Sequence, residues 1–212
     1  MFRLLLCALA LTALTSCSNL ETKEETDALG FRSVWTVDPE SGQRQGARKE
    51  YRPDGSLNIE ENYVDDQLDG RRTIYFEDGK PNIEENYAAG QFEGDYTIYF
   101  PDGKVEQFGR HIDGAKNKAW FYYYPDGKIK EVVTFENNEE NGPFREWYPD
   151  GKPKASGNYR DGDNEDGTLH LYTETGELER VMNCSLAVCN SIWTPDSTSV
   201  PPAGPDMTPP TR

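Results

Sequence analysis

The chain has 212 residues, enough for one domain of ordinary size with a core of its own. Its mean hydropathy of −0.84 and formal net charge of −16 argue against binding to nucleic acid or anionic lipid head groups, although basic partners and divalent cations stay open. Solubility alone also accounts for this charge. Aromatic residues make up 12% of the chain, which excludes a disordered composition and suits an elongated body.

Residues 1–17 are predicted to be a lipoprotein signal peptide. Arg3 gives a basic start, and the apolar run over residues 4–14 is too short for a membrane span but has the size of a signal-peptide core. The segment Leu14-Thr15-Ser16-Cys17 resembles the lipobox of bacterial lipoproteins. This resemblance implies acylation of Cys17 by a diacylglycerol and a further chain such as palmitate, which makes anchoring stable. An ordinary cleaved signal with an incidental cysteine is the alternative.

The residues after Cys17 bear on location. Ser18 is not an aspartate, which in lipoproteins of this kind implies the outer membrane, at its periplasmic or surface face. Residues 18–29 are polar and charged without periodicity, and predict a flexible tether between the lipid and the folded body.

A period of 24 residues governs the middle of the chain. The copies begin at Gly46, Gly70, Gly94, Lys118, Gly142 and Gly167. Copy five carries one extra residue within 161–166, and residues 30–45 are interpreted as a shortened capping copy. Together these segments predict one repeat domain over residues 30–190.

Each copy contains a turn signal. Four copies have Pro-Asp-Gly, in which proline fixes φ for a type I turn and glycine supplies the left-handed residue of a bulge. Glycine occupies this slot in every copy, at Gly55, Gly79, Gly103, Gly127, Gly151 and Gly176. The flanking segments are short and rich in rings and β-branched residues, which predicts strands.

Three columns of apolar residues accompany the turns. The first column is Tyr51, Tyr75, Tyr99, Tyr123, Trp147 and Tyr172, and the second is Tyr63, Tyr87, His111, Phe135, Tyr159 and Cys184. The third is Leu57, Pro81, Val105, Ile129, Pro153 and Leu178. We expect the three columns to share one face and stack into the core. The predicted fold is all-β, an elongated single-layer antiparallel sheet of tandem β-hairpins.

The repeat resembles the MORN family, in particular its bacterial variant. The match rests on Gly-x-x-x-x-Tyr-Phe-x-Asp-Gly-Lys in copies two and three and on residues 120–128 (WFYYYPDGK) in copy four. Copies one and six depart from it in their first strand. The resemblance implies stacked β-hairpins and an interaction role. Bacterial relatives often carry an antitoxin label, which a secretion signal makes doubtful because antitoxins act in the cytosol.

Acidic residues offer the first candidate chemistry. Glu60, Glu61, Glu84 and Glu85 form carboxylate pairs on adjacent hairpins, but successive residues of a strand point to opposite faces, so duplication explains them better than glycoside hydrolysis. Asp161, Asp163 and Glu165 are a weak calcium candidate, since the loop fails the EF-hand pattern and a solvated turn is the simpler interpretation. We expect no catalytic residue, no enzyme activity and no cofactor.

Cysteine usage and the C-terminal end complete the pattern. Cys184 and Cys189 lie five residues apart and predict a structural disulfide in an oxidising compartment, since a metal site would need more ligands. Residues 191–212 are proline-rich and predict a disordered tail.

The leading functional hypothesis is a lipid-anchored, non-enzymatic protein-interaction or scaffolding module of the cell envelope. The alternative is a lipoprotein that binds envelope glycan or peptidoglycan through rings beside acids, with Trp120, Phe144, Phe76 and Phe100 as the candidate surface. An antitoxin-like protein is a third reading. The expected partners are the membrane, through the N-terminal lipid, and an envelope protein. No nucleic acid is expected, and the oligomeric state stays open.

Overall fold

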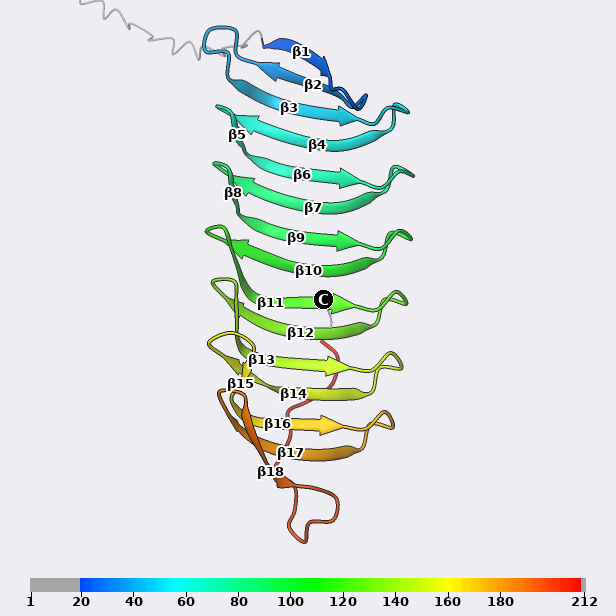
Figure 1. Ribbon diagram of the computed structural model, residues 1–212, viewed down its shortest axis with the longest axis vertical. Coiled ribbons are helices and arrows are strands. Elements are labelled where there is room, and N and C mark those ends of the chain that lie inside the picture. Colours follow the sequence, from blue (N-terminus) through cyan, green and yellow to red (C-terminus); the bar gives the residue numbers. More distant parts are fainter. Residues whose placement is uncertain (1–19, 211–212) are drawn as a thin grey trace, which may run out of the picture.

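The computed structural model describes residues 20–210, and within them the strands form one antiparallel sheet (Figure 1). Successive strands pair in chain order along the long axis, which confirms the predicted all-β, single-layer hairpin array. The strands are β1 (Glu21–Thr26), β2 (Arg32–Val37), β3 (Arg44–Tyr51), β4 (Leu57–Val64), β5 (Gln67–Leu68), β6 (Gly70–Tyr75), β7 (Pro81–Ala88), β8 (Gln91–Phe92), β9 (Gly94–Tyr99), β10 (Val105–Ile112), β11 (Ala115–Tyr123), β12 (Ile129–Glu136), β13 (Glu139–Trp147), β14 (Pro153–Arg160), β15 (Asn164–Glu165), β16 (Gly167–Tyr172), β17 (Leu178–Ser185) and β18 (Val188–Trp193).

The Asp-Gly turns stack along one long edge of the sheet, where lysines join them. Lys104 pairs with Asp102 of its own turn at 3.0 Å and donates to the Pro125 carbonyl of the next turn at 2.8 Å. Lys80, Lys128 and Lys152 make the equivalent pair and bond in their own repeats, with Glu174 supplying the carbonyl for Lys152. In copy one, where Ser56 replaces this lysine, the Arg52 guanidinium reaches the carbonyls of Leu57 and Tyr75 instead.

The opposite edge carries the turns between repeats. Two consecutive residues there adopt positive φ, as at Asn137 (53°) and Asn138 (72°), which is the conformation of a type I′ turn. The Asn138 amide donates to the Lys116 carbonyl at 3.0 Å, and the turns that hold Asp66, Gly90, Gly114 and Ala187 make the equivalent bond to the preceding repeat. Both edges therefore fix the stacking distance between hairpins.

A bulge beside each Asp-Gly turn decides which residues share a face. Glu50 pairs with Ile59 but its neighbour Tyr51 pairs with Leu57, so one extra residue lies in the return strand. This residue reverses the alternation of sides, so the Tyr63 column lies on the face opposite Tyr51 and Leu57. The prediction that all three columns share one face counted the bulge at the turn glycine and is wrong, because this further bulge in the return strand changes the parity again.

We call the face that carries Trp120, Val133 and Phe144 face A, and the face that carries Trp147, Ser156 and His170 face B. The core cluster lies on face A and consists of Trp120, Val133, Phe135, Phe144, Ala155, Leu169 and Cys184. Glycines make room for its rings: a Cβ on Gly109 would lie 2.1 Å from Trp120 Cδ2, and one on Gly157 2.9 Å from Phe144 Cε1. The large rings therefore pack directly on neighbouring backbone.

Both ends of the repeat domain differ from the predicted boundaries. Residues 21–26 of the expected tether form β1, which pairs with β2, and β18 extends the sheet to Trp193. Residues 194–210, expected to be disordered, return across face B and make hydrogen bonds to it, as described below. Within residues 20–210, no helix is long and apolar enough to cross a bilayer. The predicted signal peptide and Cys17 lie outside the described residues.

Candidate interaction surfaces

A ladder of buried ion pairs crosses the N-terminal half of face A. Glu61 is 4% exposed and accepts from Arg48 at 2.6 Å and from Arg72 at 3.0 Å, while Arg72 also donates to Glu85 at 2.9 Å. The Tyr63 hydroxyl donates to Glu61 at 2.9 Å. Charges of alternating sign thus follow each other from strand to strand. One hairpin further along, the equivalent sites hold Tyr96 and Gly109. The strands after that hold Trp120, Val133 and Phe144, so the same row changes from ionic to apolar along the sheet.

The C-terminal half of face A carries half-buried acids beside rings. Glu131 and Glu146 are direct cross-strand partners, an arrangement that destabilises a sheet when both are charged. Burial, and then the Glu146 and Glu140 carboxylates, raise the pKa of Glu131 to about 6. Burial also raises the pKa of Tyr122 to about 12 and, in the same direction, that of Tyr159. We call Tyr122, Glu131, Glu140, Glu146 and Tyr159 together the acidic patch.

The acidic patch adjoins a hollow of about 270 Å³ on the same face, which is lined in part by Glu146, Tyr159 and Leu171. Lys154 pairs with Glu146, which leaves Glu131 without a salt bridge among those recorded for residues 20–210. Cations already lie over rings elsewhere on the sheet: the Lys116 ammonium is 4.5 Å from the Trp120 ring centroid and the Arg44 guanidinium 4.0 Å from that of Tyr63. This combination of carboxylates and rings suits lysine or arginine side chains.

The rings proposed for glycan stacking divide into two groups. Trp120 and Phe144 are 0% and 3% exposed, so they are buried in the core and not accessible to a ligand. Phe76 and Phe100 are half-buried at the base of the Asp-Gly turns, where their backbone N–H groups donate to the carbonyls of Lys80 and Lys104. The four rings do not form one surface, because two of them belong to the packed interior of the array.

The paired glutamates separate to the two faces, as the alternation of a strand predicts. Glu61 and Glu85 join the ladder on face A, whereas Glu60 binds Lys49 at 2.9 Å and Glu84 binds Arg71 on face B. Each of these four carboxylates therefore has a basic partner. Neither Glu60 with Glu61 nor Glu84 with Glu85 forms a pair of acids that face a common site.

The remaining candidate residues lie near the C-terminal end of the sheet. Cys184 and Cys189 are cross-strand partners joined by a disulfide at the turn between β17 and β18. Asp161, Asp163 and Glu165 lie in the turn between β14 and β16, and in the described part of the chain no cluster of three or more acids, histidines or cysteines is placed to hold a metal ion.

The sequence interpretation missed Arg48 and Arg72, which organise the ladder, and the acidic patch. The arginines occupy equivalent slots 24 residues apart, and each faces a glutamate 13 residues later across its hairpin. That spacing is a signal that the sequence contains. The patch gives no comparable signal, because Glu131 and Glu146 become neighbours only through the register of β12 and β13.

The geometry defines a class of protein: an open array of β-hairpin repeats with two broad sheet faces. The MORN repeat variant family matches residues 44–65, 68–89, 92–107, 116–137 and 140–161. The chain is therefore a MORN-repeat protein of the variant type. Repeats of this family generally act as protein- or membrane-interaction modules. The predicted sixth copy is outside the matched residues, although β16 and β17 continue the sheet with the same hairpin. No curated protein matches the chain.

Proposed function

We propose that this chain is a lipid-anchored, non-enzymatic scaffolding protein of the cell envelope whose acidic patch binds a basic segment of a partner protein. The observation that carries the proposal is the pair Glu131 and Glu146, two like charges held opposite each other on a half-buried sheet face. A basic side chain placed beside them would offset both the burial and the carboxylate repulsion that raise the pKa of Glu131.

The anchor is supported by the lipobox-like segment that ends at Cys17. An acyl anchor would hold the array at the membrane surface despite its net charge of −16, which repels anionic head groups. Replacement of Cys17 by serine is expected to abolish palmitate labelling and to release the chain from membrane fractions. Labelling that persists in the Cys17→Ser variant would overturn the anchor.

The interaction is tested by crosslinking and mass spectrometry in intact cells. The wild-type chain is expected to yield crosslinks from lysines near the patch, such as Lys116 and Lys154, to an envelope protein. The double variant Glu131→Gln, Glu146→Gln is expected to lose them, and the exposed Glu106→Gln, which removes one charge away from the patch, is expected to keep them. Equal crosslinking by all three chains would refute the assignment of the patch.

A further inference from the structure

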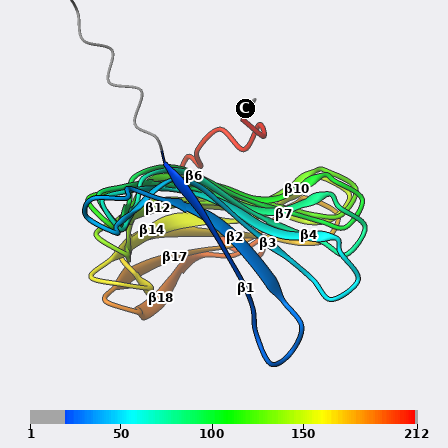
Figure 2. The same cartoon turned by 90° about the horizontal axis from the view of Figure 1, so that it is seen from above.

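The C-terminal segment lies on face B, where it crosses β16, β14 and β13 (Figure 1) and stands off one side of the sheet when seen from above (Figure 2). The Arg145 guanidinium donates to the Asp206 carbonyl at 3.0 Å, and the Trp147 indole Nε1 donates to the Met207 carbonyl at 2.8 Å. Both bonds come from sheet side chains and end on backbone carbonyls of the segment. These two hydrogen bonds therefore depend on the backbone of the segment and not on its side chains.

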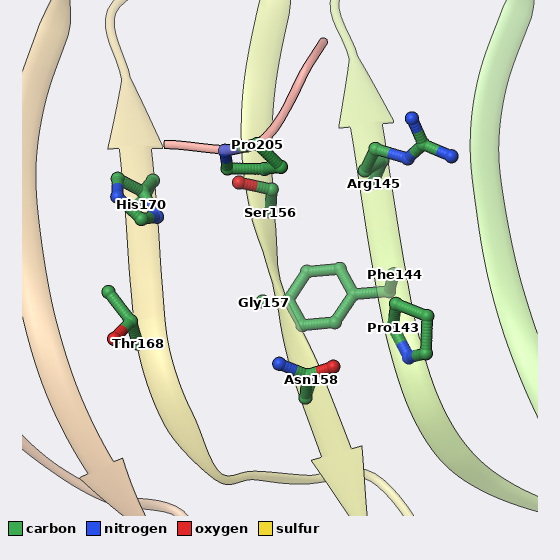
Figure 3. Close-up of a pocket in the computed structure, with 9 residues that line it drawn as sticks. All are labelled: Pro143, Phe144, Arg145, Ser156, Gly157, Asn158, Thr168, His170 and Pro205. Atoms are coloured by element: carbon green, nitrogen blue, oxygen red, sulfur yellow. The ribbon is translucent and has the colours of Figure 1, made fainter. Parts of the chain in front are cut away.

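The sheet side of this contact is buried. Trp147 is 0% exposed and His170 is 3% exposed. A cavity of about 360 Å³ remains between the segment and the sheet, lined by His170, Ser156, Arg145 and Pro205 among others (Figure 3). His170 Nε2 has no hydrogen-bond partner within residues 20–210. Ser156 Oγ, in the same lining, has none either, so the chain's own segment leaves both space and two buried polar atoms of the sheet unused within the described residues.

The composition of the segment explains what fits here. Residues 200–210 include Pro201, Pro202, Pro205, Pro209 and Pro210, and they form no strand. Prolines lack an N–H, so such a segment cannot extend the sheet, but its carbonyls stay free to accept from side chains such as Trp147 and Arg145. Aromatic-lined grooves are a recurring means of binding proline-rich chains, and Trp147 and Tyr172 supply rings next to this segment.

Close packing adds a size requirement. A Cβ on Gly204 would lie 3.0 Å from the Tyr172 hydroxyl and 3.4 Å from a carbon of the His170 ring, which is tighter than ordinary contact. A Cβ alone needs the neighbours to give by a few tenths of an ångström, so a branched side chain such as valine at this position is expected to push the segment off the sheet while the sheet's own residues stay unchanged.

We propose that this surface, which we call the tail groove and define by Arg145, Trp147, Ser156, His170 and Tyr172, is a docking site for a proline-rich segment of a partner protein. The chain's own residues 200–210 occupy the tail groove until the partner displaces them. A partner segment that fills the cavity and pairs with His170 Nε2 binds more tightly than the tail does. The inference rests on the proposed interaction role, and it adds a second surface of different chemistry on the opposite face.

The test measures binding of a fluorescent peptide with the sequence of residues 199–210 to the full chain by anisotropy. A tethered tail competes at an effective concentration in the millimolar range, so the wild-type chain is expected to bind the peptide weakly. The Gly204→Val chain, whose tail is released, is expected to bind it at least about tenfold more tightly. A peptide that carries valine at the same glycine tests the groove without altering the protein, and it is expected to lose binding.

Groove variants are made in the Gly204→Val chain. Trp147→Phe keeps a ring but removes the indole donor, and is expected to weaken peptide binding about fivefold, the effect of one hydrogen bond. Tyr99→Phe, on the same face four strands away, is the matched control and is expected to change nothing. The valine peptide decides the question if Trp147→Phe does not fold.

Three results would overturn the proposal: equal affinity of the wild-type and Gly204→Val chains, binding no stronger than that of a scrambled peptide, or full binding by the valine peptide. A wild-type chain that sediments as a dimer with exchanged tails would replace the partner by a second copy. The outcome is separate from the crosslinking test, because the acidic patch lies on face A and the tail groove on face B.

Discussion

Replacement of Arg72 by methionine is expected to destabilise the fold by about 3 kcal/mol, since it breaks the middle of the ion ladder. Arg72 bonds to Glu61 at 3.0 Å and to Glu85 at 2.9 Å, and its own side chain is 24% exposed. The substitution leaves Glu85 with only the Tyr87 hydroxyl as a donor among the recorded hydrogen bonds of residues 20–210, while Glu61 keeps Arg48. A buried carboxylate must then either stay charged without a cation or take up a proton.

The magnitude follows from burial. Removing one partner from a buried ion pair costs about 3–5 kcal/mol, and the partial exposure of Arg72 places the expected value at the lower end. Arg71→Met is the matched control, because it removes the neighbouring arginine from the opposite face. Arg71 is 60% exposed and paired with Glu84, so its loss is expected to cost less than about 1 kcal/mol.

The assay is urea unfolding followed by circular dichroism, with the free energy of unfolding taken from the midpoint at constant slope. The double variant Arg72→Met, Glu85→Leu is expected to recover most of the loss, because an apolar pair of similar volume can replace a buried ion pair. The equivalent row of the sheet already holds Trp120 and Val133. Equal destabilisation by Arg72→Met and Arg71→Met would refute the reasoning.

Three further predictions concern pH, packing and the disulfide. The pKa of Glu131 is raised to about 6 from an ordinary 4.5, so the stability of the fold falls as pH rises from about 4.5 to 6. Glu131→Gln should therefore stabilise the chain by about 1 kcal/mol at pH 7 and have no effect at pH 4. Melting curves at both pH values test this. Gly109→Ala places a Cβ 2.1 Å from Trp120 and should lower the free energy of unfolding by about 3 kcal/mol. The control Gly103→Ala, at a site with φ +90° but open space, should lower it by about 1 kcal/mol. Similar urea midpoints for the two variants would contradict this. Loss of the disulfide in Cys184→Ala, Cys189→Ala should cost about 2 kcal/mol for so short a loop, and a reducing agent should lower the melting temperature of the wild type but not of this variant.

The turns and hairpins could be predicted from sequence because they depend on contacts close along the chain. Gly55 and its equivalents need positive φ, and Pro-Asp-Gly specifies one turn, so a 24-residue spacing is enough to fix where each hairpin folds. The pairing of Cys184 with Cys189 is local in the same way, since five residues separate them across one turn.

The candidate sites were much less predictable. Trp120 and Phe144 look like exposed rings in the sequence, but Gly109 and Gly157 on neighbouring strands let them pack against the backbone and become buried. The proline-rich end looks disordered by composition, yet Arg145 and Trp147, which lie 60 or more residues earlier, supply the donors that hold it. In both cases the deciding partner is distant in sequence.

The sequence by itself determined the repeat, its turns and the single-layer hairpin array, because periodic glycines and rings act within each 24-residue unit. Only the tertiary structure decided which residues share a face. One bulge per hairpin reverses the alternation of sides, so the Tyr51 column and the Tyr63 column separate, and cross-strand register then brings Glu131 against Glu146 and Arg72 between Glu61 and Glu85. The physical reason is that a bulge shifts a strand against its neighbour, and this register decides which residues of different strands lie opposite each other on one face.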